Sequence, residues 1–76
     1  MEINEFIAKI ADLFEDTDKS VIQANTKFKE LEEWSSIMAL NVIAMVDDEY
    51  DILLRGDDIR NACTIADLFN IVNTKK

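Results

Sequence analysis

The chain has 76 residues, of which 49% are hydrophobic, with a single glycine and no proline. Its formal net charge of −8, from 8 basic and 16 acidic side chains, disfavours binding to nucleic acids and attracts basic patches on partner proteins. The absence of histidine excludes acid–base relays and metal sites that use this residue. These values predict one small all-α domain, residues 1–76, because most of the usual helix breakers are missing.

Apolar residues recur at steps of three and four from Ile3 to Phe14 and predict an amphipathic first helix. The stretch from Glu15 to Ser35 has no clean helical period, although it holds apolar anchors such as Phe28 and Trp34. Connections longer than about 12–15 residues are uncommon in small domains unless they are functional or partly structured. We therefore predict a packed loop that delivers Ser36 to the start of the second helix.

The second helix, Ser36 to about Tyr50, is apolar at nearly every position before Asp47. At about 100° per residue, the face predicted to meet the core carries Ala39, Ile43, Val46 and Tyr50. The opposite face carries Ile37, Asn41, Ala44 and Asp48, flanked by Met38 and Met45. An ordinary surface helix would be polar there, so this face is predicted to bind partner proteins through Ile37, Asn41, Ala44, Met45 and Asp48. The alternative is that the face packs beneath the long loop or in a homodimer.

Two shorter elements complete a predicted four-helix bundle. The turn at residues 55–58 carries aspartates that can start a brief third helix, ending at about Ala62. Thr64 and Asp67 fit a capping box, with Cys63 and Leu68 placed as a hydrophobic staple. The last helix should therefore run from Ile65 to about Asn73, with a buried face of Leu68, Phe69 and Val72.

Cys63 is the only cysteine, so the chain cannot form an internal disulfide. Without a histidine partner, Cys63 is expected to be a small core residue and not a nucleophile, and we expect no enzyme activity. The N-terminus lacks the basic flank and apolar core of a signal peptide, and no segment reaches the roughly 18 apolar residues of a membrane span. We therefore expect a cytoplasmic location, and separately we expect a monomer.

Ser35 and Ser36 stand at the start of the second helix, where free backbone N–H groups and the helix dipole favour an attached phosphate. Either hydroxyl can instead cap the helix, because serine is a favoured N-cap residue. Only one residue can be the N-cap, however. If Ser35 takes that role, the Ser36 hydroxyl is left free beside unsatisfied backbone donors.

The stretch from Phe28 to Tyr50 resembles the acyl carrier proteins. That family has a phenylalanine eight residues before a modified serine and an aromatic residue fourteen residues after it, and here Phe28, Ser36 and Tyr50 hold those positions. Ile37 stands where the family has leucine or methionine, and Thr64, Ile65 and Leu68 resemble the opening of the family's last helix. Ser35 replaces the family's aspartate, with Glu32 and Glu33 nearby in the sequence.

The resemblance implies that a phosphopantetheinyl transferase attaches 4′-phosphopantetheine to Ser36, with Ser35 and Ile37 completing the cofactor-binding motif. The thiol of the arm would carry acyl groups as thioesters between acyl-transferring or acyl-elongating enzymes with basic docking patches, in fatty-acid, lipid or specialised biosynthesis. No metal ligand is implied. The apolar candidates for lining an acyl cavity are Phe28, Leu40, Ile43, Val46, Ile59, Ala62 and Leu68.

Two other functions fit parts of the sequence. The chain could be an unmodified, carrier-like helical adaptor that binds a partner protein through its second helix. Acidic residues two apart, beginning at Asp47, also start an EF-hand-like calcium register. Its sixth position is Ile52 where an EF-hand needs glycine, and its twelfth is Asp58 where an EF-hand has glutamate, so we interpret this stretch as solvated acidic surface.

Overall fold

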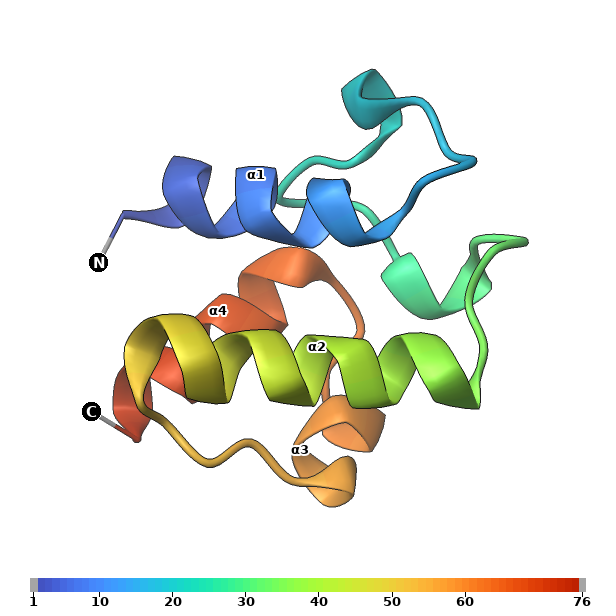
Figure 1. Cartoon of the computed structure of the whole chain (residues 1–76). Helices are drawn as coiled ribbons and strands as arrows, with labels where there is room; N and C mark the ends of the chain where they lie inside the picture. The colour runs from blue at the N-terminus through green and yellow to red at the C-terminus, as the bar shows by residue number, and fades with distance from the viewer. Residues whose placement is uncertain (1, 76) are drawn as a thin grey trace.

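The computed structural model describes residues 2–75 and contains the helices α1 (Ile3–Leu13), α2 (Ser36–Tyr50), α3 (Gly56–Asn61) and α4 (Ile65–Thr74) (Figure 1). Two 3₁₀ turns, Lys19–Val21 and Phe28–Glu30, lie in the connection between α1 and α2. The predictions of an all-α domain, a long first loop and a short third helix are therefore confirmed. Met1 and Lys76, at the ends of the predicted domain, lie outside the described residues.

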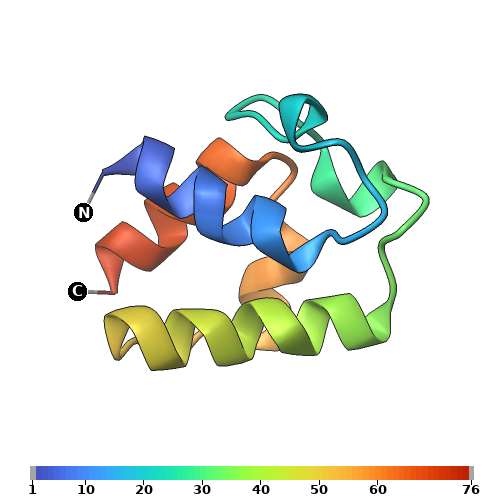
Figure 2. The same ribbon diagram turned by 45° about the horizontal axis from the view of Figure 1, so that its top comes forward.

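The first helix forms where its apolar period predicts. Phe6 and Ile10 are buried on one side of α1, and Phe14, directly after the helix, is buried as well. Burial of each such side chain stabilises the fold by roughly 1.5–3 kcal/mol. α1 runs antiparallel to α2 (Figures 1 and 2), and the ring centroid of Phe6 lies 6.1 Å from that of Tyr50 near the end of α2.

The long connection is packed against the helices, as its length and apolar anchors predict. The ring centroid of Trp34 lies 5.1 Å from that of Phe28, edge to face, and 6.3 Å from that of Phe14, stacked. At these separations aromatic pairs add about 0.5–1.5 kcal/mol beyond burial alone. This cluster fixes the end of the loop and therefore fixes the residues that open α2.

The core-facing side of the second helix matches the prediction only in part. Val46 is buried as predicted, and Ala39, Ile43 and Tyr50 are partly buried and pack against the core, but the other two buried side chains of the helix are Met38 and Val42. Met38, predicted to flank the outer face, is therefore a core residue, and Leu40, a predicted cavity-lining residue, is 64% exposed. Apolar side chains lie on most sides of the helix, so its sequence pattern does not indicate which side faces the core. Packing against α1 and the rest of the core decides which side is buried.

The third helix begins at Gly56 and is held by a carboxylate in its first turn. Asp58 Oδ2 accepts the backbone N–H of Arg55 at 2.9 Å and lies 3.1 Å from Nζ of Lys75, beyond the end of α4. The pKa of Asp58 is lowered by the backbone hydrogen bond first and by Lys75 second. Ile59 is the residue of α3 that reaches the core.

The last helix starts at the predicted capping box. Thr64 Oγ1 accepts the N–H of Asp67 at 3.1 Å, and Asp67 Oδ2 accepts the N–H groups of Thr64 at 3.1 Å and Cys63 at 3.0 Å. Of the predicted buried face, Leu68 and Val72 are buried and Phe69 is partly buried.

The prediction of Cys63 as a core residue in a hydrophobic staple is wrong, because its side chain is exposed. Ala62 and Thr64 on either side have extended backbone angles, and successive side chains of an extended chain point to opposite sides. Ala62 is fully buried, so Cys63 is turned outward.

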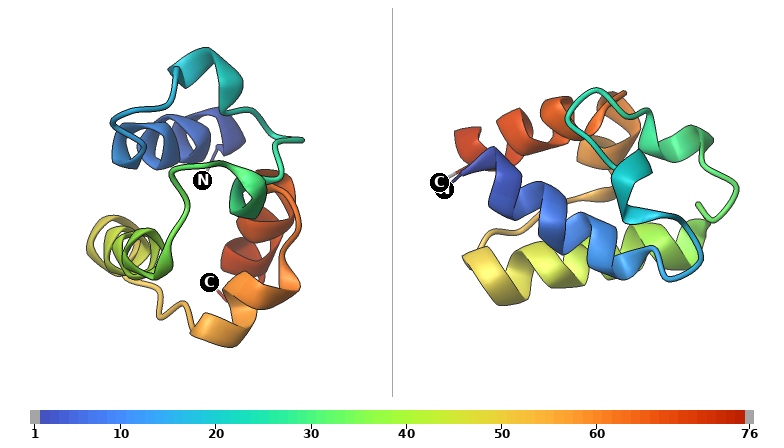
Figure 3. Two further views of the ribbon diagram at one scale, coloured as in Figure 1. Left: turned by 90° about the vertical axis from the view of Figure 1, so that its right-hand side faces the viewer. Right: turned by 90° about the horizontal axis from the view of Figure 1, so that it is seen from above.

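The buried side chains of α1, α2, α3, α4 and the long connection form one hydrophobic cluster. Figure 3 shows from two further directions how the helices and the long connection that contribute these residues are arranged around one another. Within residues 2–75, no helix is both long enough and apolar enough to cross a membrane.

Candidate functional site

Ser35 is the N-cap of α2. Its backbone is extended, with φ −157° and ψ 174°, and its Oγ accepts the N–H of Met38 at 3.2 Å. The Ser35 carbonyl also accepts the first helical hydrogen bond, from Ala39 N at 3.0 Å. The geometry therefore gives the capping role to Ser35 and not to Ser36, the division of roles that leaves the second hydroxyl available.

Ser36 is the first residue of α2, and its side chain is exposed. Among the residues that the structure describes, no hydrogen bond engages its hydroxyl. The N–H groups of Ser36 and Ile37 belong to the first turn, which has no intrahelical acceptors, and the positive end of the helix dipole lies at the same place. An oxyanion attached to Ser36 would meet these donors.

A groove of about 530 Å³, which we call the serine groove, opens beside Ser36. It is formed where the end of the long loop, the start of α2 and α3 meet, and its lining residues are Lys29, Trp34, Ser35, Ser36, Ala39, Leu40, Gly56, Ile59 and Arg60. Two cationic side chains, Lys29 and Arg60, line this groove together with Ser36, in a chain whose net charge is −8.

Each of the two cations of the serine groove contacts a neighbouring residue. Lys29 Nζ donates to the backbone carbonyl of Arg60 at 2.8 Å, which ties the loop to the end of α3. The Arg60 guanidinium forms an ion pair with Asp57, one turn earlier in α3, and both of these side chains are largely exposed. Sequence reasoning did not single out Lys29 and Arg60, and it named Trp34 only as an apolar anchor of the loop, because no local pattern relates these residues to Ser36.

The two glutamates near Ser35 have different environments. Glu33 Oε1 accepts hydrogen bonds from the backbone N–H of Asp16 at 3.1 Å and from Thr17 Oγ1 at 2.8 Å. Glu33 therefore holds the two ends of the long loop together. Glu32 is exposed, and its carboxylate has no hydrogen-bond partner within residues 2–75, so its charge is available to a partner.

The predicted partner-binding residues separate into two places. Ile37 is 69% exposed at the start of α2. The other four, Asn41, Ala44, Met45 and Asp48, line a second groove of about 510 Å³ between α1 and α2, which also includes Lys9, Asp12, Leu13 and Glu49. We call it the α1/α2 groove. Asn41, Ala44 and Asp48 are exposed, and Met45 is partly buried, so the face is not covered by the long loop.

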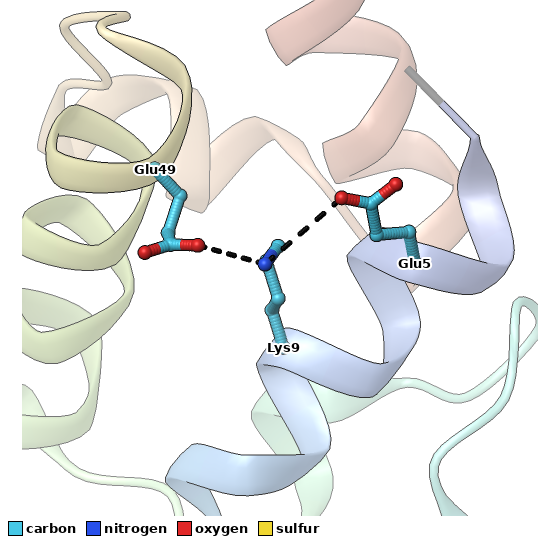
Figure 4. A network of polar contacts seen from close by, with 3 residues as sticks. All are labelled: Glu5, Lys9 and Glu49. Carbon is cyan, nitrogen blue, oxygen red and sulfur yellow. Dashed lines mark hydrogen bonds and ion pairs between the residues drawn. The ribbon is translucent and has the colours of Figure 1, made fainter.

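One end of the α1/α2 groove is closed by an ion pair between the two helices. Lys9 Nζ donates to Glu49 Oε1 at 2.7 Å and lies 4.0 Å from Glu5 Oε1 on its own helix (Figure 4). The hydrogen bond to Glu49 raises the pKa of Lys9 above its ordinary value. The positive charge of Lys9 is therefore paired with these two carboxylates.

The acidic stretch from Asp47 to Asp58, which was considered as an EF-hand-like calcium loop, is mostly helical. Asp47 and Glu49 lie within the last turn of α2, so the register that begins at Asp47 is not a loop. In the part of the chain from residue 2 to residue 75, no three acidic, cysteine or histidine side chains come together as metal ligands would.

Comparison with family models, with curated proteins and with solved structures gives no match for this chain.

Proposed function

We propose that this chain is a carrier protein of the acyl carrier type, which holds acyl intermediates as thioesters on a 4′-phosphopantetheine arm attached to Ser36. The observation that supports this most is the division between the two serines. Ser35 caps α2, and Ser36 presents an unengaged hydroxyl at the positive end of the helix. The fold proposed with it is an acyl-carrier-like four-helix bundle.

Attachment would use the Ser36 oxygen as the nucleophile. A transferase removes the hydroxyl proton, the oxygen bonds to the phosphorus nearest the pantetheine in coenzyme A, and 3′,5′-ADP leaves with the electron pair of the broken P–O bond. The product is a phosphodiester, which carries one negative charge. The first-turn N–H groups of α2 and the cations Lys29 and Arg60 lie on the side where that charge would form.

The residues of the serine groove fit the rest of such an arm. Trp34, Leu40 and Ile59 offer apolar surface, while Ser35 and the exposed ends of Lys29 and Arg60 offer polar contacts. Once attached, the arm would supply a thiol that forms and releases thioesters. The chain itself would bind the arm and present the acyl group to other enzymes. Tethering raises the effective concentration of the acyl group at a docked enzyme.

The partners expected for such a carrier are a phosphopantetheinyl transferase and acyl-transferring or acyl-elongating enzymes with basic docking patches. A net charge of −8 favours encounter with such patches. The charge that the family's aspartate brings to the transferase is missing at Ser35, and Glu32 is the exposed carboxylate that would supply it.

The test is the intact mass of the protein after incubation with coenzyme A, magnesium and a broad-specificity phosphopantetheinyl transferase. Wild type is expected to gain one phosphopantetheine, Ser36→Ala none, and Ser35→Ala one. The Ser35→Ala variant is the matched control, since it removes a neighbouring hydroxyl of the same type. Modification of Ser36→Ala, or no gain in wild type with several transferases, would overturn the proposal.

An unmodified adaptor is the second candidate, and the exposed apolar residues at the start of α2 favour it. Ile37 and Leu40 are 69% and 64% exposed. Large apolar side chains at exposed positions are not needed for the stability of the helix, and they are available to a partner. An adaptor would keep its partner affinity in Ser36→Ala, whereas a carrier would lose all activity in a reconstituted pathway.

A further inference from the structure

We propose that Glu33 is a positioning residue for the modification of Ser36. By holding the end of the long loop against the end of α1, Glu33 fixes the direction in which the Ser36 hydroxyl meets the transferase. The inference rests on the proposed function, because it concerns how readily that reaction takes place. Glu33 acts through the residues that follow it and not on the reacting atoms themselves.

One oxygen of Glu33 makes both of its contacts with the far end of the loop. Oε1 accepts the backbone N–H of Asp16 at 3.1 Å and the hydroxyl of Thr17 at 2.8 Å, which lie 17 and 16 residues earlier in the chain. Glu33 and Thr17 are partly buried, and hydrogen bonds to an ionised acceptor are stronger than those between neutral groups. α1 ends and α2 begins at the same end of the molecule (Figure 2), so this contact joins the two helices there.

Only two residues separate Glu33 from Ser36, and both of them are held. Trp34 donates its backbone N–H to the carbonyl of Leu31 at 3.0 Å, which closes the turn that carries Glu33. The Trp34 ring lies in the aromatic cluster of the loop, and Ser35 caps α2. A displacement of Glu33 is therefore passed directly to Ser36.

The contacts of Glu33 differ from those of its neighbours in direction and in reach. The aromatic contacts of Trp34 are apolar and tolerate rotation, whereas hydrogen bonds weaken steeply when they bend. The cap of Ser35 bonds to Met38 within α2, so it moves together with the helix. Within residues 31–36, the hydrogen bonds that reach a distant part of the chain are those of Glu33.

A fixed hydroxyl favours binding to the transferase. The enzyme binds productively the molecules in which Ser36 faces its active site, so its apparent affinity falls in proportion to the fraction of molecules in that state. Loss of a hydrogen bond shifts an equilibrium of this kind by roughly two- to tenfold. Once the chain is bound, the hydroxyl reacts in the same geometry. The expected signature is therefore a raised KM for the chain with an unchanged kcat.

The alternative is that Glu33 serves the transferase through its negative charge. Two conservative substitutions separate the roles. Glu33→Gln removes the charge, but its amide oxygen can accept both hydrogen bonds, because a single carboxylate oxygen accepts them in the wild type. Glu33→Asp keeps the charge, but its side chain is shorter by one methylene group, so the carboxylate no longer reaches Asp16 and Thr17. Positioning and charge thus predict opposite rankings of the two variants.

The kinetic test measures kcat and KM for the transfer of phosphopantetheine from coenzyme A to each variant. We expect Glu33→Asp to raise KM about five- to tenfold and Glu33→Gln less than about twofold, with kcat nearly constant in both. Thr17→Val removes one donor at the other side of the contact and should raise KM about two- to threefold. Glu15→Gln is the control, because its exposed carboxylate makes no hydrogen bond within residues 2–75, and it should leave KM unchanged.

A second measurement uses the unmodified chain alone, without coenzyme A or transferase. ¹⁵N relaxation gives the order parameters of the backbone N–H groups of Trp34, Ser35 and Ser36. We expect values near about 0.85 in the wild type and in Glu33→Gln, and values that fall toward about 0.6 in Glu33→Asp. Circular dichroism of each variant checks that the helices are formed.

The outcomes distinguish failure of this inference from failure of the proposed function. A wild-type chain that no transferase modifies would overturn the proposed function, and the inference with it. A modified wild type in which Glu33→Gln has a higher KM than Glu33→Asp would show that charge is the role of Glu33. That result, equal KM values for the two variants, or unchanged order parameters in Glu33→Asp would each overturn the inference alone.

Discussion

Ser35 and Ser36 are adjacent serines with opposite roles: Ser35 Oγ accepts the N–H of Met38 at 3.2 Å, and the Ser36 hydroxyl has no hydrogen-bond partner within residues 2–75. A cap on one residue fixes the start of the helix and so fixes the direction of the next side chain. The stability of α2 and the availability of Ser36 therefore depend on different atoms, and they can be changed separately.

Substitutions of Ser35 should show this separation. Ser35→Ala removes the cap and is expected to lower the free energy of unfolding by about 1 kcal/mol, while modification at Ser36 persists. Ser35→Asp keeps a good cap and adds the charge that the carrier family has there, so it should unfold within about 0.5 kcal/mol of wild type and be modified roughly threefold faster or more. Urea unfolding and initial transferase rates measure the two effects. Full stability of Ser35→Ala would show that the cap does not hold α2.

The burial found for α2 predicts a sharp contrast between two of its apolar residues. Met38 is 6% exposed, and Met38→Ala should lower the free energy of unfolding by about 2–3 kcal/mol, because it leaves a cavity in the core. Leu40, two residues away, is mostly exposed, so Leu40→Ala should change it by less than about 0.5 kcal/mol. Chemical denaturation of both variants measures the difference. Equal losses would contradict the orientation of α2.

The contrast between Met38 and Leu40 also shows that the sequence predicts the ends of α2 but not its buried side. The bounds of α2 and the caps at Ser35 and Thr64 follow from local signals, namely an apolar run preceded by a hydroxyl residue. The buried side of α2 does not follow, because a helix that is apolar nearly all round is oriented by what packs against it.

Some features of the candidate site could likewise be predicted from the sequence, and others could not. Capping acts within one turn of helix, so the sequence could limit the cap to Ser35 or Ser36, and the structure assigns it to Ser35. The cations of the serine groove, Lys29 and Arg60, come from a loop and from α3, and only the folded path of the chain brings them beside Ser36. The contribution of α1 to the lining of the α1/α2 groove was missed for the same reason. In the sequence, Asp12 and Leu13 look like ordinary positions of an amphipathic helix.

Carboxylates that cap helices should set the acid limit of stability. Backbone hydrogen bonds from Thr64 and Cys63 lower the pKa of Asp67. Carboxyl groups in the unfolded chain titrate near about 3.9. Because the folded pKa is the lower one, Asp67 stabilises the fold above that pH, and its contribution is lost as the pH falls through the folded pKa. Asp67→Asn should therefore have a flatter fall of Tm with decreasing pH than wild type.

Glu30→Gln is the control for the pH experiment. Glu30 is exposed, and its carboxylate accepts no hydrogen bond within the described residues, so this variant should keep the wild-type slope of Tm below about pH 5. A slope that flattens equally in both variants would show that general charge, and not the capping box, sets the acid limit.

The exposure of Cys63 predicts its reactivity and affects how attachment of the proposed arm is assayed. Its side chain is at the surface, so a thiol reagent should modify it in the folded protein nearly as fast as in the unfolded chain. Thiol counts with such a reagent should be one for the unmodified wild type and two after attachment of the arm. Cys63→Ser should give none and one. A thiol that reacts only after denaturation would contradict the outward orientation of Cys63.

The most direct test of the central claim is fragmentation mass spectrometry of the chain isolated from the cells that make it. The account predicts one phosphopantetheine, located on Ser36 by fragments that separate it from Ser35. A chain found only with an unmodified Ser36, or with the arm on Ser35, would contradict it.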